Sequence, residues 1–223
     1  QSEIIAKWNV LAAPLKGLVI GNHLQPITGD ANSNRAIETP MANLVADAIL
    51  DNTTSLGAQV ALMNVGGVRA SLNKISYGEA DGEITYAEAF DIAPFGNVYV
   101  ALDLTGAQLK QVLEQQYQPV PARGSRPMLA MGVSDGVSYT WDATKPQGSR
   151  VVAGSMKLNN VAIGDTETVR VGTLNFLADG GDLFTAFKSG TNVVGGIGDL
   201  EGLVAYFKTH PDLTPPGDRI AGL

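Results

Sequence analysis

The sequence predicts an α+β fold in which helices and sheets are layered in a single domain. Helix-like and strand-like segments follow one another without the strict strand–helix alternation that is typical of a doubly wound parallel sheet. The length of 223 residues and the hydrophobic content of 44% are sufficient to bury a substantial core. The chain contains no internal repeat and no low-complexity segment.

Three segments carry helix signals. In "ETPMANLVADAIL", Thr39 is placed as the N-cap and Pro40 as the first helical residue, ahead of an apolar face. Thr105 is expected to cap "GAQLKQVLEQQ", whose apolar residues have helical spacing. "DLEGLVAYFKTH" has the pattern of an amphipathic helix near the end of the chain.

Other segments alternate or cluster their apolar residues as strands do. Strands are expected at "GAQVALMN", "NVYVALDL", "VSYTW", "VVAGSMKLNN" and "TVRVGTLNF". Turn residues such as Asn159-Asn160 and Gly164-Asp165 separate the later ones. Residues 119–127, "PVPARGSRP", are predicted to form a mobile surface loop.

Composition excludes several classes of protein. A net charge of −7 argues against a nucleic-acid partner, because binding to a phosphate backbone needs a basic face. The absence of Cys excludes disulfides, thiolate zinc sites and a catalytic thiol. No apolar run approaches the about 20 residues of a membrane span. The opening "SEIIAKWNVLAAPLKG" is typical of a helix that enters from a preceding part of a protein, and no leader pattern is seen there.

The stretch "VIGNHLQPITGD" raises the question of a metal site, since Gly-Asn-His occurs in dinuclear metallophosphatases. Such a site needs several His and Asp/Glu ligands around ions about 3.5–4 Å apart. The chain has only two histidines: His23 is expected in a turn after a strand, and His210 as a C-terminal helix cap. We therefore predict no metal ligands in this chain.

Two further enzyme motifs are also missing. "GGIGDLEG" has Glu201 where a dinucleotide-binding motif needs its last glycine, and no strand clearly precedes it. No Ser lies in a G-x-S-x-G elbow, so no nucleophile is assigned.

The segment "MNVGGVRAS" has a composition suited to ligand binding. Asn64 ends a predicted buried strand and is followed by Gly66-Gly67 and then Arg69. Glycines let a ligand approach the main chain, and an arginine offers paired donors to phosphate or carboxylate. The alternative is an ordinary glycine turn with a surface arginine.

Two further loops carry aromatic and acidic side chains. "DIAPFGNV" contains Phe95 and Asn97, and "LNFLADGGDLF" contains Phe176 and Asp182. Two Phe side chains can stack on a planar base, which contributes about 1–3 kcal/mol per base. An Asp in a glycine turn can accept hydrogen bonds from adjacent ribose hydroxyls. Taken singly, a Phe is more often part of the core and an Asp more often a turn former, and spacing alone does not place the three loops together.

Taken together, these motifs resemble the C-terminal, substrate-binding domain of the 5′-nucleotidase / UDP-sugar hydrolase family. "IETPMANLVADAIL", "NVGGVR", "ITYAEAFDIAPFGNVYVALDLTGAQLKQVLE" and "TLNFLADGGDLF" occur in the family's order. The resemblance implies roles for eight positions: base stacking by Phe95 and Phe176, ribose binding by Asp182, phosphate contact by Arg35 and Arg69, and pocket lining by Asn64, Gly66 and Asn97. Two residues depart from the pattern, since Val65 and Leu183 stand where glycines are usual; Val65 is expected to narrow the pocket floor, and Leu183 to restrict the Asp182 turn.

The resemblance also implies a larger enzyme. Residues 1–16 would be the connecting helix from a missing N-terminal metallophosphatase domain, which would hold two divalent metal ions, and residues 17–223 the C-terminal domain. The function implied is nucleotide binding for phosphate monoester hydrolysis, with this chain inactive alone and the protein periplasmic, cell-wall-bound or secreted. The alternatives are a 2′,3′-cyclic-nucleotide phosphodiesterase/3′-nucleotidase, a UDP-sugar hydrolase, or a stand-alone nucleoside-binding module.

Overall fold

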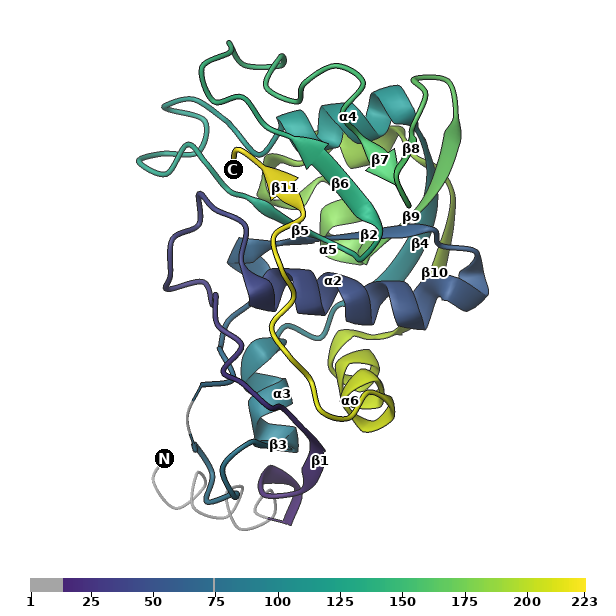
Figure 1. The fold of residues 1–223 in the computed structure, drawn as a ribbon. Helices are drawn as coiled ribbons and strands as arrows, with labels where there is room; N and C mark the ends of the chain where they lie inside the picture. The colour runs from purple at the N-terminus through teal and green to yellow at the C-terminus, as the bar shows by residue number, and fades with distance from the viewer. Residues whose placement is uncertain (1–13, 74) are drawn as a thin grey trace, which may run out of the picture.

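The computed structural model describes residues 14–73 and 75–223, and it has the predicted α+β fold in one layered domain (Figure 1). Its centre is a mixed sheet of five strands. In spatial order, these are β10 (Thr191–Gly198), β4 (Val98–Thr105), β9 (Thr168–Leu174), β2 (Val60–Asn64) and β5 (Met131–Val133). Neighbouring strands are antiparallel except β9 and β2, which are parallel.

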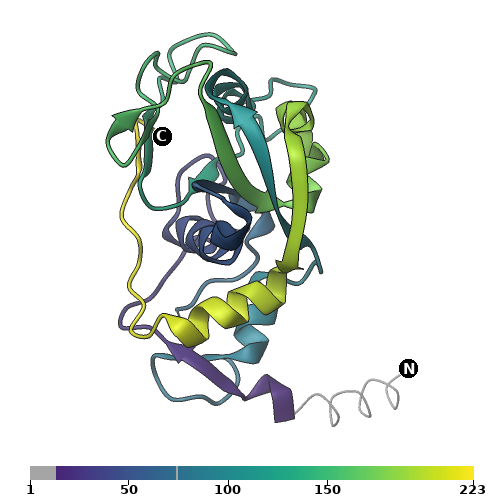
Figure 2. The same ribbon diagram turned by 90° about the vertical axis from the view of Figure 1, so that its right-hand side faces the viewer.

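Helix α2 (Pro40–Thr53) covers one face of this sheet, and the 3-10 helix η1 (Thr54–Leu56) follows it (Figure 2). The predicted start is confirmed, because the Thr39 side chain accepts a hydrogen bond from the Ala42 N–H. Close packing depends on glycine in β5, where a Cβ at Gly132 would lie 2.4 Å from the Ala42 backbone.

The opposite face of the sheet is covered by shorter helical segments (Figure 2). They are α4 (Gly106–Glu114), α5 (Asn175–Ala178) and the 3-10 helices η3 (Gly181–Leu183) and η4 (Thr185–Ser189). The capping of α4 by Thr105 is confirmed, and it is a capping box in which the Gln108 side chain accepts from the Thr105 N–H.

Two small sheets complete the domain. At one end lie β11 (Ile220–Ala221), β6 (Val137–Thr140), β7 (Lys157–Leu158) and β8 (Val161–Ala162). At the other end are β1 (Val19–Asn22), β3 (Glu83–Thr85), α3 (Tyr86–Ile92) and α6 (Asp199–Thr209) (Figure 1). The predicted turn at Asn159-Asn160 joins β7 to β8, and both residues have positive φ, at 50° and 65°.

Three expectations from the sequence need correction or lie outside the described residues. A strand is present at "GGIGDLEG", because its first glycines lie within β10, which runs directly into α6. "VVAGSMKLNN" is not a continuous strand: only Lys157–Leu158 and a bridge between Val151 and Trp141 are extended. Of the predicted connecting helix over residues 1–16, only 14–16 are described, and these are helical.

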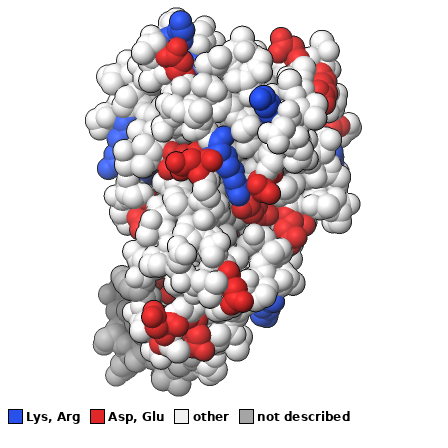
Figure 3. Space-filling view, viewed as in Figure 1, with Lys and Arg blue, Asp and Glu red and all other residues white. Residues whose placement is uncertain are grey.

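The surface reflects the acidic composition. On the face seen in Figure 3, Asp and Glu side chains are widespread, and Lys and Arg occur in small separate groups. Within the described part of the chain, no helix is both long enough and apolar enough to cross a membrane.

Candidate functional site

The topology of the central sheet brings the three glycine-marked loops to one edge. Strands β2 and β9 are parallel, so the chain leaves both at the same edge, after Asn64 and Leu174. Strand β4 is antiparallel to β9 and begins there, since Tyr99 is paired with Leu174. The loops after β2 and β9 and the turn before β4 therefore meet, which the sequence alone did not establish.

A cavity of about 450 Å³ lies where these loops meet. All eight site residues predicted from the sequence line it, together with Gly67 and Leu174. The predicted residues are Arg35, Asn64, Gly66, Arg69, Phe95, Asn97, Phe176 and Asp182. This volume falls within the range of about 300–1,000 Å³ that is typical of small-molecule sites.

The acidic side of the cavity is organised by Asn64. Its buried side chain donates a hydrogen bond of 2.6 Å from Nδ2 to Asp182 Oδ2. Asn64 Oδ1 is buried and has no partner among the described residues. Because an unsatisfied buried acceptor costs about 1–3 kcal/mol, a hydrogen bond donated to this oxygen would stabilise the site. A side chain at Gly67 would fill the space, with its Cβ 2.8 Å from that oxygen.

The two aromatic side chains stand at the cavity with accessible faces: Phe95 is 55% exposed and Phe176 is 43% exposed. The turn of Phe95 is fixed at Asn97, whose backbone N–H donates to Asp199 Oδ2 at 3.0 Å and whose carbonyl accepts from Asp199 N–H at 2.9 Å. The Phe176 ring packs over Gly181, where an added Cβ would lie 2.5 Å from the ring.

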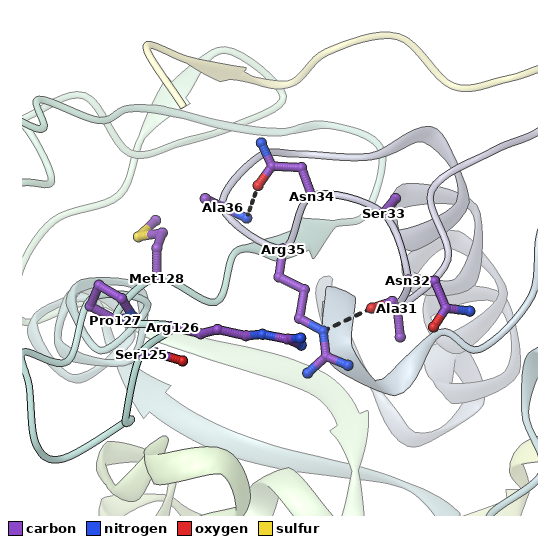
Figure 4. Close-up of a pocket in the computed structure, with 10 residues that line it drawn as sticks. All are labelled: Ala31, Asn32, Ser33, Asn34, Arg35, Ala36, Ser125, Arg126, Pro127 and Met128. Atoms are coloured by element: carbon purple, nitrogen blue, oxygen red, sulfur yellow. Dashed lines mark hydrogen bonds between the residues drawn. The ribbon is translucent and has the colours of Figure 1, made fainter.

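Two guanidinium groups reach the same cavity. Arg35 Nε donates to the Ala31 carbonyl at 2.9 Å, which orients the side chain and leaves its two terminal nitrogens without a hydrogen bond to the described residues (Figure 4). The Arg69 guanidinium lies 5.7 Å from the Phe95 ring centroid and donates to the Gly66 carbonyl at 3.3 Å. Arginine forks of this kind suit phosphate or carboxylate groups.

The sequence model of the 5′-nucleotidase C-terminal domain matches residues 19–189. The chain belongs to this family. It is 34% identical over 200 residues to the trifunctional nucleotide phosphoesterase protein YfkN of Bacillus subtilis, covering 87% of the chain and 12% of that protein. It is 30% identical over 195 residues to the protein UshA of Escherichia coli, covering 87% of the chain and 32% of UshA.

Solved structures agree with this assignment. The 5′-nucleotidase precursor of Thermus thermophilus superposes with a TM-score of 0.79 at 29% identity, over 99% of this chain and 42% of that one. The chain thus spans less than half the length of each of these relatives. It corresponds to the C-terminal domain of 5′-nucleotidase family proteins.

The two departures from the family pattern have different outcomes. Val65 is buried, bonds through its N–H to the Ala130 carbonyl and does not line the cavity, so the expectation that it narrows the pocket floor is wrong. Leu183 has a φ of 66° and Asp182 a φ of 50°. The Asp182 turn is therefore left-handed even with a leucine, in a region that disfavours residues with a Cβ.

Arg123, which was not among the residues predicted from the sequence, anchors the loop of residues 119–127. Its guanidinium donates to the carbonyls of Gln116 at 2.7 Å, Gln115 at 3.1 Å and Asp182 at 2.5 Å. Burial lowers the pKa of Arg123, and the Asp182 carboxylate opposes this shift. The predicted loop lies at the surface, but this arginine fastens it to the Asp182 turn. Only the hydrogen-bonding capacity of arginine hinted at such a role.

The two histidine predictions have different outcomes. His23 follows β1 as expected, but it forms a β-bridge with Leu213 instead of lying in a turn, and its Nδ1 lies 2.9 Å from the Gln25 carbonyl oxygen. The prediction for His210 is confirmed: it is the C-cap of α6, and its ring stacks on Tyr206 with centroids 4.1 Å apart. Among residues 14–73 and 75–223, no three His, Cys, Asp or Glu side chains form a group that could hold a metal ion. The described residues therefore do not fit a dinuclear metal centre.

Proposed function

We propose that this chain is the nucleotide-binding specificity domain of a metal-dependent 5′-nucleotidase-type phosphohydrolase. The observation that carries the proposal is the meeting of two accessible Phe faces, the Asn64–Asp182 pair and two arginines on one cavity of about 450 Å³. These groups match the three parts of a nucleotide: a planar base, a sugar with adjacent hydroxyls and an anionic phosphate.

Each part of the ligand has a role for particular residues. The base would stack on Phe95 and Phe176, next to Asn97. Asp182, held by Asn64, would accept hydrogen bonds from the ribose hydroxyls, and the free Asn64 Oδ1 would accept one more. Arg35 and Arg69 would bind the phosphate, with Gly66 giving the ligand close access to the backbone. The domain thereby contributes orientation rather than bond cleavage.

The chemical step would belong to a separate metallophosphatase domain, carrying two divalent metal ions, that precedes this chain. Residues 1–16 would then form the connecting helix and residues 17–223 the C-terminal domain. The length of the relatives supports this arrangement, because the chain spans only 32% of UshA. A similar protein from Listeria monocytogenes is a cell wall protein, at 30% identity, which supports a periplasmic, cell-wall or secreted location.

The chain alone is expected to hydrolyse no nucleotide, even with divalent metals, because its described residues lack a ligand cluster. Phosphate release from AMP would be measured against a control without protein. Release above that control that is lost in Arg69→Ala would contradict the proposal. The alternatives, a 2′,3′-cyclic-nucleotide phosphodiesterase/3′-nucleotidase or a UDP-sugar hydrolase, use the same pocket, so a substrate panel on the longer protein separates them.

The test of the binding site itself is calorimetric titration of this chain with adenosine and AMP in EDTA. We expect micromolar-to-millimolar binding that Phe95→Ala and Phe176→Ala each abolish. An unchanged affinity in both variants would contradict the base clamp. Sequencing the coding region upstream tests the stand-alone alternative, a nucleoside-binding module, because Asp-x-His and Gly-Asn-His-Glu motifs there would mark a catalytic domain.

A further inference from the structure

Arginines are concentrated at the site of an otherwise acidic chain. Four of the seven arginines line three adjoining cavities, although the net charge is −7. Beside the cavity of about 450 Å³ lies one of about 300 Å³ that shares Arg35 and Asp182 with it and adds Arg123 and Arg126. A third, of about 690 Å³, is lined by both Arg35 and Arg126.

Arg126 is held towards Arg35 by its loop. Arg123 fastens residues 119–127 to the carbonyls of Gln115, Gln116 and Asp182, and the Arg126 N–H donates to the Arg123 carbonyl at 3.3 Å. Figure 4 shows the extended Arg126 side chain pointing towards the Arg35 guanidinium inside the cavity. The two arginines therefore line the same cavities, and their side chains converge.

Within the described part of the chain, no carboxylate forms an ion pair with Arg35 or Arg126. The ion pairs of residues 14–73 and 75–223 join Arg170 to Asp103 and Arg219 to Asp47 instead. The nearby Asp182 carboxylate already accepts from Asn64, and no hydrogen bond of the Arg126 side chain is found within the described residues. Like charges that share a cavity repel each other, and an anion between them would relieve the repulsion.

We propose that Arg126 and Arg35 form a second anion subsite, which binds a phosphate group of the ligand other than the one held by Arg35 and Arg69. This inference rests on the proposed function, and it adds that the preferred ligand carries two phosphate groups. Arginine suits this task because its planar fork donates two parallel hydrogen bonds to phosphate. Asn32, Ser33 and Ser125 supply further polar groups along the cavity.

The second phosphate has two possible points of attachment. A phosphate attached to a ribose 2′- or 3′-hydroxyl would extend from the first cavity beside Asp182 into the cavity with Arg126, since Asp182 lines both. A second phosphate in the 5′ chain would pass Arg35, which lines all three cavities. Adenosine 3′,5′-bisphosphate and ADP distinguish these two sources.

The experiment is calorimetry of this chain in EDTA with AMP, ADP, adenosine 3′,5′-bisphosphate and inorganic pyrophosphate. The variants are Arg126→Gln and Lys157→Gln, the second of which removes an equal charge from exposed β7. We expect either ADP or adenosine 3′,5′-bisphosphate to bind about tenfold more tightly than AMP, because hydrogen bonds from a charged arginine to a second phosphate are stronger than hydrogen bonds between neutral groups. Arg126→Gln should abolish this advantage and leave AMP binding and the unfolding temperature unchanged, and Lys157→Gln should preserve it.

Each result bears on one of the two proposals. Equal affinities for AMP, ADP and the bisphosphate overturn the subsite, while AMP binding that depends on Phe95 keeps the proposed function. The subsite is also overturned if Arg126→Gln and Lys157→Gln reduce the affinity advantage over AMP equally, because the effect would then come from net charge and not from the position of Arg126. If no nucleotide binds, the proposed function fails. In that case pyrophosphate binding lost in Arg126→Gln supports the subsite, and no pyrophosphate binding overturns it.

Discussion

The side-chain Oδ1 of Asn175 accepts a 2.9 Å hydrogen bond from the backbone N–H of Val98. Asn175 immediately precedes Phe176, and Val98 follows the turn that carries Phe95 and Asn97. The bond therefore ties together the two loops that carry the aromatic side chains. It fixes their separation independently of the strand pairing between β4 and β9.

Asn175→Ala is expected to weaken adenosine binding about two- to tenfold, the equivalent of the about 0.5–1.5 kcal/mol that one hydrogen bond contributes. Without the tie, the spacing of Phe95 and Phe176 is less restricted in the free protein, and ordering them opposes binding. Affinity would be measured by calorimetry. Asn175→Asp is the matched control, because its carboxylate also accepts from the Val98 N–H. If Asn175→Asp binds adenosine as weakly as Asn175→Ala, the hydrogen bond to Val98 is not the cause of the lost affinity.

Gly181→Ala is expected to displace the Phe176 ring and to reduce the affinity for adenosine. Its Cβ would lie 2.5 Å from the ring and 2.6 Å from the Phe176 carbonyl oxygen, too close to be accommodated without a shift. Gly195→Ala in β10 is the control, because nothing lies within 4 Å of a Cβ there. Titration of both variants with adenosine tests the prediction, and equal affinities would contradict it.

Asp182→Asn is expected to remove most of the discrimination between adenosine and 2′,3′-dideoxyadenosine. The wild-type carboxylate should favour adenosine about tenfold or more, because hydrogen bonds to charged groups contribute about 1.5–3 kcal/mol. Asn is the suitable replacement because it tolerates the φ of 50° at this position. Competition binding with both nucleosides gives the ratio directly. A ratio near one in the wild type would remove Asp182 from ribose binding.

How far the sequence predicts this protein depends on the range of the interactions involved. Thr39 and Thr105 mark helix starts through contacts within one turn, so their caps were predicted correctly. Strand β10 was missed because its three glycines weaken the strand pattern and its pairing with β4 is non-local. Seven of the eight pocket residues stand out in the three glycine-marked loops, while Arg35 and the meeting of the loops were inferred only through the family resemblance, which the sheet topology then explained.

Other parts of the site could not be predicted from local patterns. Asp199 is a common first residue of a helix, and its bonds to Asn97 join positions 102 residues apart. Asn175 and Arg123 act likewise through backbone groups that only the tertiary fold brings near. Residue type did not single out any of these three positions, because Asn, Asp and Arg are all usual in surface loops.

The pH dependence of stability provides a last prediction, at the Asp103 carboxylate on β4. Hydrogen bonds from Asn192 and from Arg170, at 2.7 and 2.8 Å, lower the pKa of Asp103 below its ordinary value of 3.8. A carboxylate with a lowered pKa in the folded state stabilises that state fully above the unfolded value. The contribution is lost as the pH falls below 3.8 towards the folded pKa, since the folded state must then take up a proton that breaks these bonds.

Asp103→Asn should therefore lower the free energy of unfolding at neutral pH and flatten its decline below pH 3.8. Urea unfolding at several pH values measures both effects. Asp165→Asn, in the exposed turn after β8, controls for the loss of one carboxylate and should remain near wild type at neutral pH. A decline with pH that is as steep in Asp103→Asn as in the wild type would mean that other carboxylates govern acid unfolding, because the proton uptake at position 103 is absent from that variant.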